Sequence, residues 1–324
     1  MNSKLFALLT LIAVILIAGC IENNINAYPG VSITDFSPTI STVRAGSPIE
    51  LRVVVQNFGF FDAENANVII FNCGPSSTGR SDGLPLNAVY NCNGNVFASN
   101  FNLLKPDREA GIAGDLKEAE VSLSTIPDDF PQGRSSQTFS ARVIYDYSTT
   151  GAADVTFTTF QNWKEKGGRI IAQQLNAFST AAPLTLLLNV PQEPIIVDNP
   201  AAANFTVGLS IRNTGQGFVT PEKTLEKIKL CYDSDFVEPL RDERNHYYDF
   251  QELEINPTGN NCLVIPSTNE TAKLVGLTNQ YRDVDARFRN VLGKIKIQDS
   301  TTFDAELTYT YTFDRSTTVT ILNA

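Results

Sequence analysis

The chain has 324 residues, of which 42% are hydrophobic and 19% charged, and its mean hydropathy is close to zero. These values are typical of a folded protein long enough for two domains, and they exclude both a polytopic membrane protein and a wholly disordered chain. The net charge of −10 makes the surface acidic, so the chain repels phosphate backbones and a nucleic-acid partner is not expected.

The amino terminus has the features of an export signal. After Lys4, residues 5–19 are all apolar or small, and this stretch is too short to cross a hydrocarbon core of about 30 Å comfortably. It ends in IAGC, which resembles a lipobox, the site where prolipoproteins are cleaved and lipidated. We therefore expect residues 1–19 to be a lipoprotein signal peptide, Cys20 to carry the lipid and residues 20–30 to form a tether. An ordinary signal peptide and an uncleaved anchor are the alternatives, and all three place the remaining chain outside the cytoplasm.

Four cysteines remain once the lipidated one is set aside, and three pairings among them are possible. One close pair lies in each half of the chain, which favours Cys73–Cys92 and Cys231–Cys262. Each disulfide would add roughly 3 kcal/mol of stability by restricting the unfolded chain. A metal site is the alternative, but the chain has no CxxC spacing and a single histidine.

An internal repeat organises the chain after the tether. Residues 49–59 (IELRVVVQNFG) and 205–215 (FTVGLSIRNTG) alternate apolar and polar side chains and end in Asn-x-Gly. This is the pattern of a half-buried strand closed by turn residues that tolerate left-handed backbone. Residues 139–157 align without a gap to residues 303–321, and we expect each segment to form a hairpin. Between these blocks, NVIIFNC and KIKLCY each place a cysteine at the end of a short apolar strand.

Each of the two predicted hairpins carries a pair of tyrosines on its inward face. If they were exposed, these side chains would form a platform on which sugars stack. Their position within the apolar alternation favours the core instead. The tyrosines are Tyr145, Tyr147, Tyr309 and Tyr311.

Short alternating strands with Gly, Pro and Asn turns predict a mainly β protein with two tandem immunoglobulin-like β-sandwiches. We expect the sandwiches at residues 31–160 and 183–324, joined by a linker at residues 161–182. The stretch VRAGSPIELRVVVQNFGFFDAENANVIIFNC resembles the opening of a CARDB-type domain, an immunoglobulin-like module of archaeal and bacterial surfaces. The second copy keeps only the strand and turn of that pattern. The resemblance implies an extracellular adhesive or scaffolding module. The residues that carry this resemblance are Gly46, residues 49–55, Asn57, Gly59, Ala66 and residues 68–70.

Two segments have the spacing of short helices. RIIAQQLNAF, residues 169–178, follows two glycines and places Ile171, Leu175 and Phe178 on one face. YRDVDARFRNVLG, residues 281–293, sets apolar side chains at helical spacing and stops at a glycine typical of a helix C-cap. We expect the first helix in the linker and the second between sandwich strands.

Catalytic motifs are not evident. No serine lies in a Gly-x-Ser-x-Gly elbow, and no glycine-rich run has the pattern of a phosphate loop. A pair of carboxylates of the glycosidase kind stays open, because the 35 acidic residues could be paired by the fold. We predict a non-enzymatic protein without a cofactor.

One acidic stretch, DSDFVEPLRDER, is a weak candidate for calcium binding. Asp233, Asp235 and Glu238 supply hard oxygen ligands, but the spacing lacks the glycine and final glutamate of an EF-hand loop. Arg241 and Arg244 also lie close by. A solvated loop inside the Cys231–Cys262 bridge is the favoured alternative.

Two further features bear on contacts at the surface. The cluster His246-Tyr247-Tyr248 forms either a contact surface, since exposed tyrosines add binding area at low entropic cost, or a group packed beneath its own loop. Asn204 and Asn269 begin N-glycosylation sequons, and Asn269 is the better candidate because Asn204 lies against a predicted strand.

These features together predict a lipid-anchored protein of a prokaryotic surface, outside the cytoplasm and facing outward. Sequons beside a lipobox favour an archaeal source. The predicted role is adhesion or scaffolding through an unknown surface protein or glycan. An accessory subunit of a surface layer, pilus or secretion assembly is one alternative, and an extracytoplasmic hydrolase is the other.

Overall fold

The computed structural model describes residues 30–71, 96–123, 133–168, 178–198, 202–255, 260–277 and 279–323. Most of this chain is strand arranged in three sheets, which confirms the predicted mainly β, sandwich-like fold. The predicted signal peptide, Cys20 and the Cys73–Cys92 pair lie outside the described residues. Among the described residues, no helix combines the length and the apolar character needed to span a membrane.

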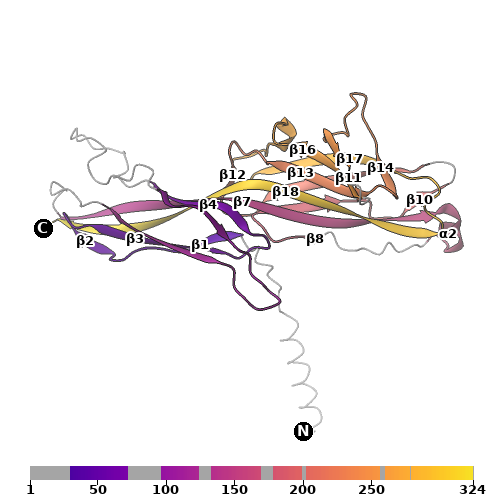
Figure 1. Cartoon of the computed structure of the whole chain (residues 1–324). Coiled ribbons are helices and arrows are strands. Elements are labelled where there is room, and N and C mark those ends of the chain that lie inside the picture. The colour runs from indigo at the N-terminus through magenta and orange to yellow at the C-terminus, as the bar shows by residue number, and fades with distance from the viewer. Residues whose placement is uncertain are drawn as a thin grey trace, which may run out of the picture.

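Two very long strands form the centre of the molecule. β7 (Gly133–Thr159) and β18 (Gln298–Asn323) pair in antiparallel fashion along all 26 residues of β18, and Figure 1 shows them as one twisted ribbon along the long axis. The two hairpins predicted in these segments are wrong. Each segment is a continuous strand, because the other copy supplies the hydrogen bonds that a hairpin would have made within one copy.

The ladder carries an approximate twofold axis. In the sequence repeat Tyr145 aligns with Tyr309, whereas in the ladder Tyr145 pairs with Tyr311 and Tyr147 pairs with Tyr309. Exchanging the two copies therefore maps the ladder onto itself, with the Asp146–Thr310 pair at its centre. We call this central region the waist of the molecule.

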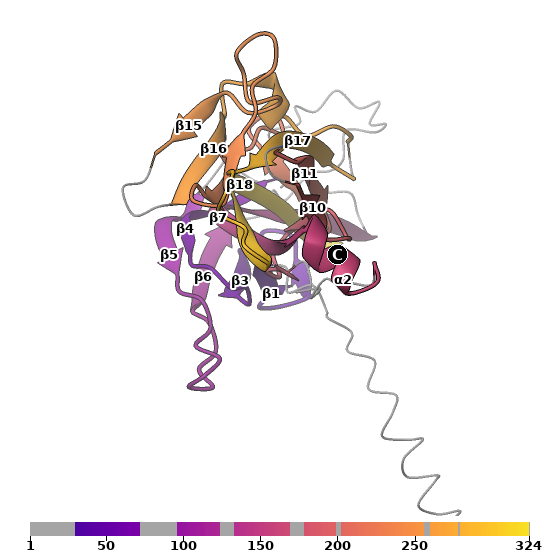
Figure 2. The same cartoon turned by 90° about the vertical axis from the view of Figure 1, so that its right-hand side faces the viewer.

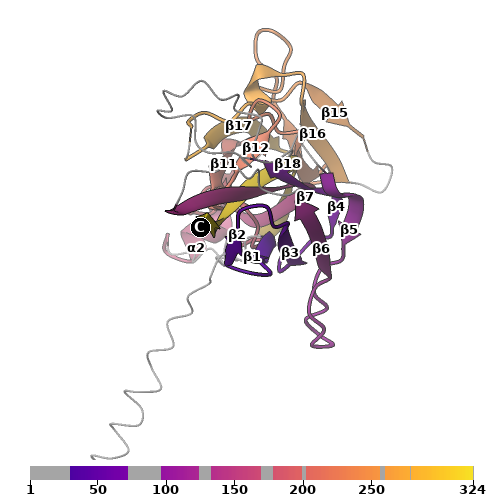
Figure 3. The ribbon, with the colours of Figure 1, turned by 90° about the vertical axis from the view of Figure 1, so that its left-hand side faces the viewer.

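The first sandwich lies on one side of the waist. Its two layers are the sheet β1-β3-β6 and the strands β4 and β5 beside the first half of β7. The connection between β5 and β6 projects away from the body, as the two end views show (Figure 2, Figure 3). The strands are β1 (Val31–Pro38), β2 (Thr42–Arg44), β3 (Ile49–Asn57), β4 (Ala63–Phe71), β5 (Val96–Leu103) and β6 (Leu116–Leu123).

The second sandwich repeats this plan on the other side of the waist. Its layers are the sheet β14-β17-β11-β9 and the strands β13, β16 and β15 beside the first half of β18. The strands are β8 (Phe178–Ser179), β9 (Leu184–Asn189), β10 (Ile195–Val197), β11 (Asn204–Asn213), β12 (Phe218–Thr220), β13 (Lys227–Asp233), β14 (Val237–Pro239), β15 (Glu252–Glu254), β16 (Asn260–Pro266) and β17 (Tyr281–Asn290).

Each long strand runs through both sandwiches. The ring of Phe157, from β7, packs 5.7 Å from that of Phe205 in the second sandwich. Reciprocally, the N–H of Thr320, near the end of β18, donates to the carbonyl of Ser41 in the first sandwich at 2.9 Å. The buried side chains of both halves form one continuous core. The predicted domain bounds at residues 160 and 183 mark the two copies of the sequence repeat. In the structure, each sandwich also contains part of the long strand that belongs to the other copy.

The predicted helix at residues 281–293 is wrong, because residues 281–290 form β17. Val284, Ala286 and Phe288 are buried and alternate with exposed Asp and Arg side chains, which is the period of a strand. The helix predicted at residues 169–178 lies outside the described residues except for Phe178, which begins β8. In the described part of the chain, α2 (Phe160–Glu165) and the short 3-10 helix Glu270–Ala272 are the helical elements.

Candidate contact surfaces

The four tyrosines of the ladder lie in the core at the waist, as the alternation predicted. All are at most 3% exposed. Their hydroxyls accept backbone N–H groups in matched positions. Val31 and Leu184, which begin β1 and β9, donate to Tyr145 and Tyr309, each at 3.4 Å. Burial raises the pKa of Tyr147 and of Tyr311 to about 12. A sugar-stacking platform built from these rings is therefore ruled out.

The two Asn-x-Gly turns pack against these hydroxyls. The Asn213 amide donates to the carbonyl of Gly217 at 2.8 Å and accepts the Gly215 N–H at 3.1 Å, and Asn57 makes the matching contacts in the first copy. The expected left-handed backbone is absent from Gly59 and Gly215. The glycines are needed for space instead, because a Cβ at residue 59 would lie 1.6 Å from the Tyr147 hydroxyl and one at residue 215 would lie 2.4 Å from that of Tyr311.

The His246 cluster lies in the connection between β14 and β15. Asp242 shapes this loop by accepting the N–H groups of Arg244 and His246, both at 2.9 Å. Arg241 lies over the Tyr247 ring at 4.7 Å and donates to its hydroxyl at 2.5 Å. Tyr247 is 6% exposed. The residues of the cluster therefore differ in exposure: Tyr247 packs beneath the loop, whereas His246 is exposed to solvent.

Tyr248 faces the neighbouring strand. The guanidinium of Arg287, on β17, lies 4.6 Å from the centre of its ring, and Tyr248 is half-buried. Next to it, Asp249 accepts the N–H of Asp285 at 2.8 Å. Burial and the nearby charges of Asp249 and Asp283 raise the pKa of the Asp285 carboxyl. Tyr248 and Arg287 thus form a small amphipathic surface next to the loop that carries exposed His246, and we call this region the His246 surface.

The carboxylates of the acidic stretch are engaged in ion pairs and in a turn. Asp235 pairs with Lys294 at 3.2 Å and Glu238 pairs with Arg289 at 2.5 Å. The Asp233 carboxylate accepts the N–H of Asp235 at 2.8 Å and so closes the turn. Within the described ranges no group of three or more acidic, cysteine or histidine side chains is arranged to hold a metal ion. The favoured alternative of a solvated loop agrees with these ion pairs.

The structure places both sequon asparagines but does not test their modification. Asn204 begins β11 and is exposed, pairing with Arg289 across to β17. Asn269 is half-buried and caps the 3-10 helix, because its side chain accepts the N–H of Thr271 at 2.9 Å. A glycan on Asn269 would leave that oxygen free to accept the bond, so both sites stay predictions.

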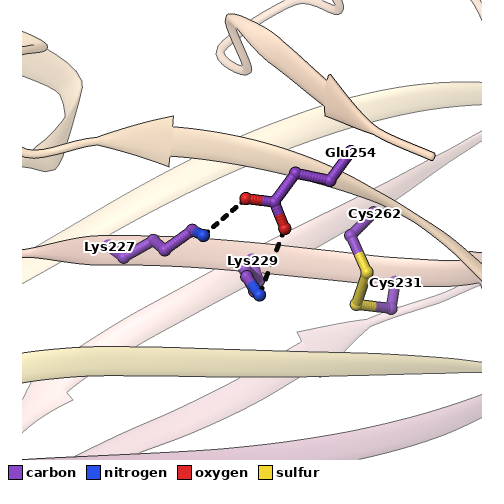
Figure 4. Close-up of a disulfide and its surroundings, with 5 residues drawn as sticks. All are labelled: Lys227, Lys229, Cys231, Glu254 and Cys262. Carbon is purple, nitrogen blue, oxygen red and sulfur yellow. Dashed lines mark hydrogen bonds and ion pairs between the residues drawn. A yellow bond between two sulfur atoms is a disulfide. The ribbon is translucent and has the colours of Figure 1, made fainter. Parts of the chain in front are cut away.

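The disulfide Cys231–Cys262 is present, which confirms the predicted pairing in the second copy. The two residues lie directly opposite each other on β13 and β16 with a Cα–Cα distance of 3.9 Å. On the same face, Glu254 pairs with Lys227 at 2.5 Å and Lys229 at 3.1 Å (Figure 4). The hydrogen bond from Lys227 is the main reason that the pKa of Glu254 is lowered. The bridge closes the segment that carries His246 and Tyr248.

Sequence reasoning missed an apolar surface at the end of the second sandwich. Phe160 is 46% exposed and stacks on Trp163 at a centroid distance of 5.9 Å, and Ile297 beside them is 65% exposed. A hollow of about 510 Å³ opens here between α2, β10 and the segment before β18. We call this region the Phe160 surface. In the sequence, the only tryptophan of the chain is followed directly by the charged residues KEK, and this pattern could have indicated an aromatic side chain near the surface.

Comparisons with known proteins give no family. No protein-family model matches the chain, and no curated protein matches it. Among solved structures, the Enterococcus faecalis MSCRAMM ACE is 9% identical over 90% of this chain and 95% of that chain, with a TM-score of 0.16. The collagen adhesin CNA of S. aureus is 10% identical over 92% and 94%, with a TM-score of 0.15. The Streptococcus pneumoniae pilus backbone RrgB is 11% identical over 64% of each chain, with a TM-score of 0.17. Similarities this low carry no argument about function, and the CARDB resemblance has no family model behind it.

Proposed function

We propose that this chain is a lipid-anchored surface protein that works without catalysis, as an adhesion or scaffolding module outside the cytoplasm. The ladder of β7 and β18 supports this most, because it joins two sandwiches into one stiff body. At about 3.3 Å per residue, a ladder of 26 pairs spans on the order of 80 Å. Such a body holds surfaces at its two ends at a set separation. Its mechanism is positional, with Cys20 anchoring and exposed surfaces binding a surface protein or glycan.

The electrostatics of the described residues also support a binding role. The carboxylates of Glu118 and Asp283, whose pKa values are lowered, lie on exposed strand faces in ion pairs with Arg52 and Arg212. Tyr145 and Tyr309, whose pKa values are raised well above the usual value by burial, lie in the core. A hydrolase would need acids with perturbed pKa values gathered in a deep cleft. The Phe160 and His246 surfaces instead present aromatic and cationic side chains, which are common at protein interfaces.

The anchor is tested by replacing one residue. Cys20→Ser removes the thiol that would receive the lipid, so the protein should move from the membrane fraction to the soluble fraction. Phase partition of cells that express each form measures this. A matched Cys73→Ser variant should stay with the membrane. Retention of the Cys20→Ser protein in the detergent phase would disprove lipid anchoring and leave an uncleaved anchor.

The binding role is tested by cross-linking intact cells, capturing the protein and identifying what comes with it by mass spectrometry. We expect one surface component to be recovered and its yield to fall at least fivefold in the Phe160→Ala, Ile297→Ala double variant. Ile40→Ala, which truncates a 62% exposed side chain in the first sandwich, is the control. A His246→Ala variant tests the His246 surface independently of the Phe160 surface. Recovery of a surface-layer or appendage subunit would make the chain an accessory of that assembly. Recovery of nothing above background would contradict protein scaffolding and direct assays to glycans and hydrolysis.

A further inference from the structure

Two connections meet the waist at matched places, one in each copy. The N–H of Asn57 donates to the carbonyl of Asp115, just before β6, at 3.1 Å. In the second copy the N–H of Asn213 donates to the carbonyl of Gln280, just before β17, at 2.8 Å. The approximate twofold axis therefore relates the segment that leads into β6 to the segment that leads into β17. We call these segments the two waist loops, which are residues 104–116 in the first copy and residues 267–277 with 279–281 in the second.

Both waist loops expose large apolar side chains. Leu116 and Tyr281 hold equivalent places, because each pairs with the residue just before the Asn of an Asn-x-Gly turn. Leu277 is 83% exposed. Single exposed apolar residues are common on protein surfaces, but their gathering on the same loop of both copies indicates a contact surface. The exposed apolar residues of the two loops are Leu104, Ile112, Leu116, Val275, Leu277 and Tyr281.

The first waist loop is held by the Asn-x-Gly turn beside it. The guanidinium of Arg108 lies 4.0 Å from the centre of the Phe60 ring and donates to the carbonyl of Phe58 at 3.2 Å. Gly114 packs so closely that a Cβ on it would lie 2.0 Å from the carbonyl oxygen of Asn57. The loop is thus a fixed projection from the body, as the two end views show (Figure 2, Figure 3).

The chain enters the fold beside both waist loops. Gly30, the first described residue, accepts the N–H of Phe58 at 2.7 Å, and the same Phe58 carbonyl region is held by the first waist loop. A Cβ on Gly30 would lie 3.1 Å from Pro183. The carbonyl of Pro183 accepts the N–H of Thr214, which follows the residue that bonds to the second waist loop. Short chains of contacts therefore link Gly30 to both loops.

The length of the preceding chain limits how the molecule can lie on a membrane. From Cys20 to Gly30 the chain advances by ten residues, and a fully extended chain of that length spans at most about 35 Å. Half of the 26-residue ladder, from the waist to one end, spans on the order of 40 Å. A body standing on one end would therefore hold its waist beyond the reach of an anchor at Cys20. With that anchor, the long axis lies along the membrane and the face around Gly30 is turned toward the lipid.

We propose that the two waist loops contact the lipid bilayer and hold the body flat on the outer face of the membrane. The side chains of Ile112 and Leu277 enter the boundary between headgroups and acyl chains, where apolar groups are removed from water. Residues 104–117 carry three cationic and three acidic side chains, so this loop brings no net charge to the lipid, although the whole chain carries −10. The inference rests on the lipid anchor of the proposed function. The ends of the body then face sideways, toward neighbours on the same membrane.

The test maps which residues meet lipid. The lipidated full chain is reconstituted in phosphatidylcholine vesicles that contain a small share of phosphatidylcholine with a diazirine on one acyl chain. After illumination, peptide mapping identifies the residues joined to lipid. We expect the two waist loops to carry at least fivefold more lipid than the segments around Ile40 and Ile297. These are matched controls, because the two side chains are 62% and 65% exposed and lie near opposite ends of the ladder.

A pair of variants separates lipid contact from anchoring. Ile112→Gln with Leu277→Gln should lower the lipid joined to the rest of the waist loops at least fivefold, because polar side chains do not enter the apolar boundary. The chain should still float with the vesicles, since its anchor is unchanged. Ile40→Gln with Ile297→Gln should change neither measurement. All four side chains are exposed, so both variants should keep the melting temperature of the unmodified protein.

Vesicle flotation shows which idea has failed when the lipid label is missing. A chain that floats with the vesicles but carries no lipid on its waist loops would overturn the membrane contact and leave the anchor in place. Lipid concentrated around Ile40 or Ile297 would show that the body stands on an end, which would also overturn it. A chain that does not float would disprove the anchor itself, and the membrane contact with it.

Discussion

At the scale of single residues, hydroxyls at the waist hold the turns of both copies. Tyr311 donates to the Asn213 amide oxygen at 3.0 Å and accepts the N–H of Gly217 at 2.9 Å. Tyr311→Phe leaves two partly buried polar groups without this partner, so we expect the free energy of unfolding to fall by about 1 kcal/mol. Urea unfolding measures the change. Tyr281→Phe, at a ring that is 43% exposed, should have almost no effect, and equal losses in both variants would contradict the argument.

Two aspartates on β17 should respond to pH in opposite ways. The pKa of Asp285 is raised, chiefly because its carboxyl is partly desolvated although the side chain is exposed. Its charge therefore costs stability as the pH rises above the unfolded pKa. Asp285→Asn should therefore stabilise the protein at pH 7 by about 0.5 kcal/mol, with no gain at a pH where the carboxyl is protonated in both states. The hydrogen bond from Arg212 lowers the pKa of Asp283, which therefore stabilises the fold above its unfolded pKa and loses this effect as the pH falls. Asp283→Asn should destabilise at pH 7. Melting curves from pH 3 to 7 test both signs.

At the scale of elements, the disulfide links two neighbouring strands over a sequence separation of 31 residues. Replacing both Cys231 and Cys262 with serine should lower the free energy of unfolding by about 3–4 kcal/mol, because the unfolded chain regains the entropy of that loop. Urea unfolding of the oxidised protein, the reduced protein and the variant measures this. Glu254→Gln, on the same face, should cost at most about 1 kcal/mol, since its ion pairs are partly exposed. An unchanged midpoint in the serine variant would contradict a stabilising role for the bridge.

β17 shows how short-range periodicity can mislead at this scale. Val284 and Phe288 are four residues apart, a spacing that suits one face of a helix and also one face of a strand. Ala286 between them decides the matter, because it is buried in line with both, while the alternating Asp and Arg side chains face outward. Pairing with β11 over residues 281–289 satisfies backbone groups that a helix would have satisfied internally.

At the scale of the whole molecule, the crossing of β7 and β18 joins the stability of the two sandwiches. We expect a single calorimetric transition, because neither half keeps its core when the other unfolds. Deleting residues 309–323 should loosen the first sandwich, although the deletion lies at the end of the second copy. Hydrogen exchange should rise more in β1 and β3 than in β11 and β17. Two separate transitions, or exchange that rises mainly in the second sandwich, would show that the halves fold independently.

The amino-acid sequence by itself determined the mainly β fold, the duplication, the buried tyrosines and the Cys231–Cys262 pair. These depend on alternation and on similarity between the copies, and both can be read along one strand. Only the tertiary structure decided that residues 139–157 and 303–321 are unbroken strands paired with each other, that Gly59 and Gly215 make room for tyrosine hydroxyls, and that Phe160 is exposed beside a hollow. The physical reason is that a strand makes its backbone hydrogen bonds to other strands, which can lie far along the chain. A local pattern shows which face is buried, but the identity of the covering partner depends on contacts between distant segments.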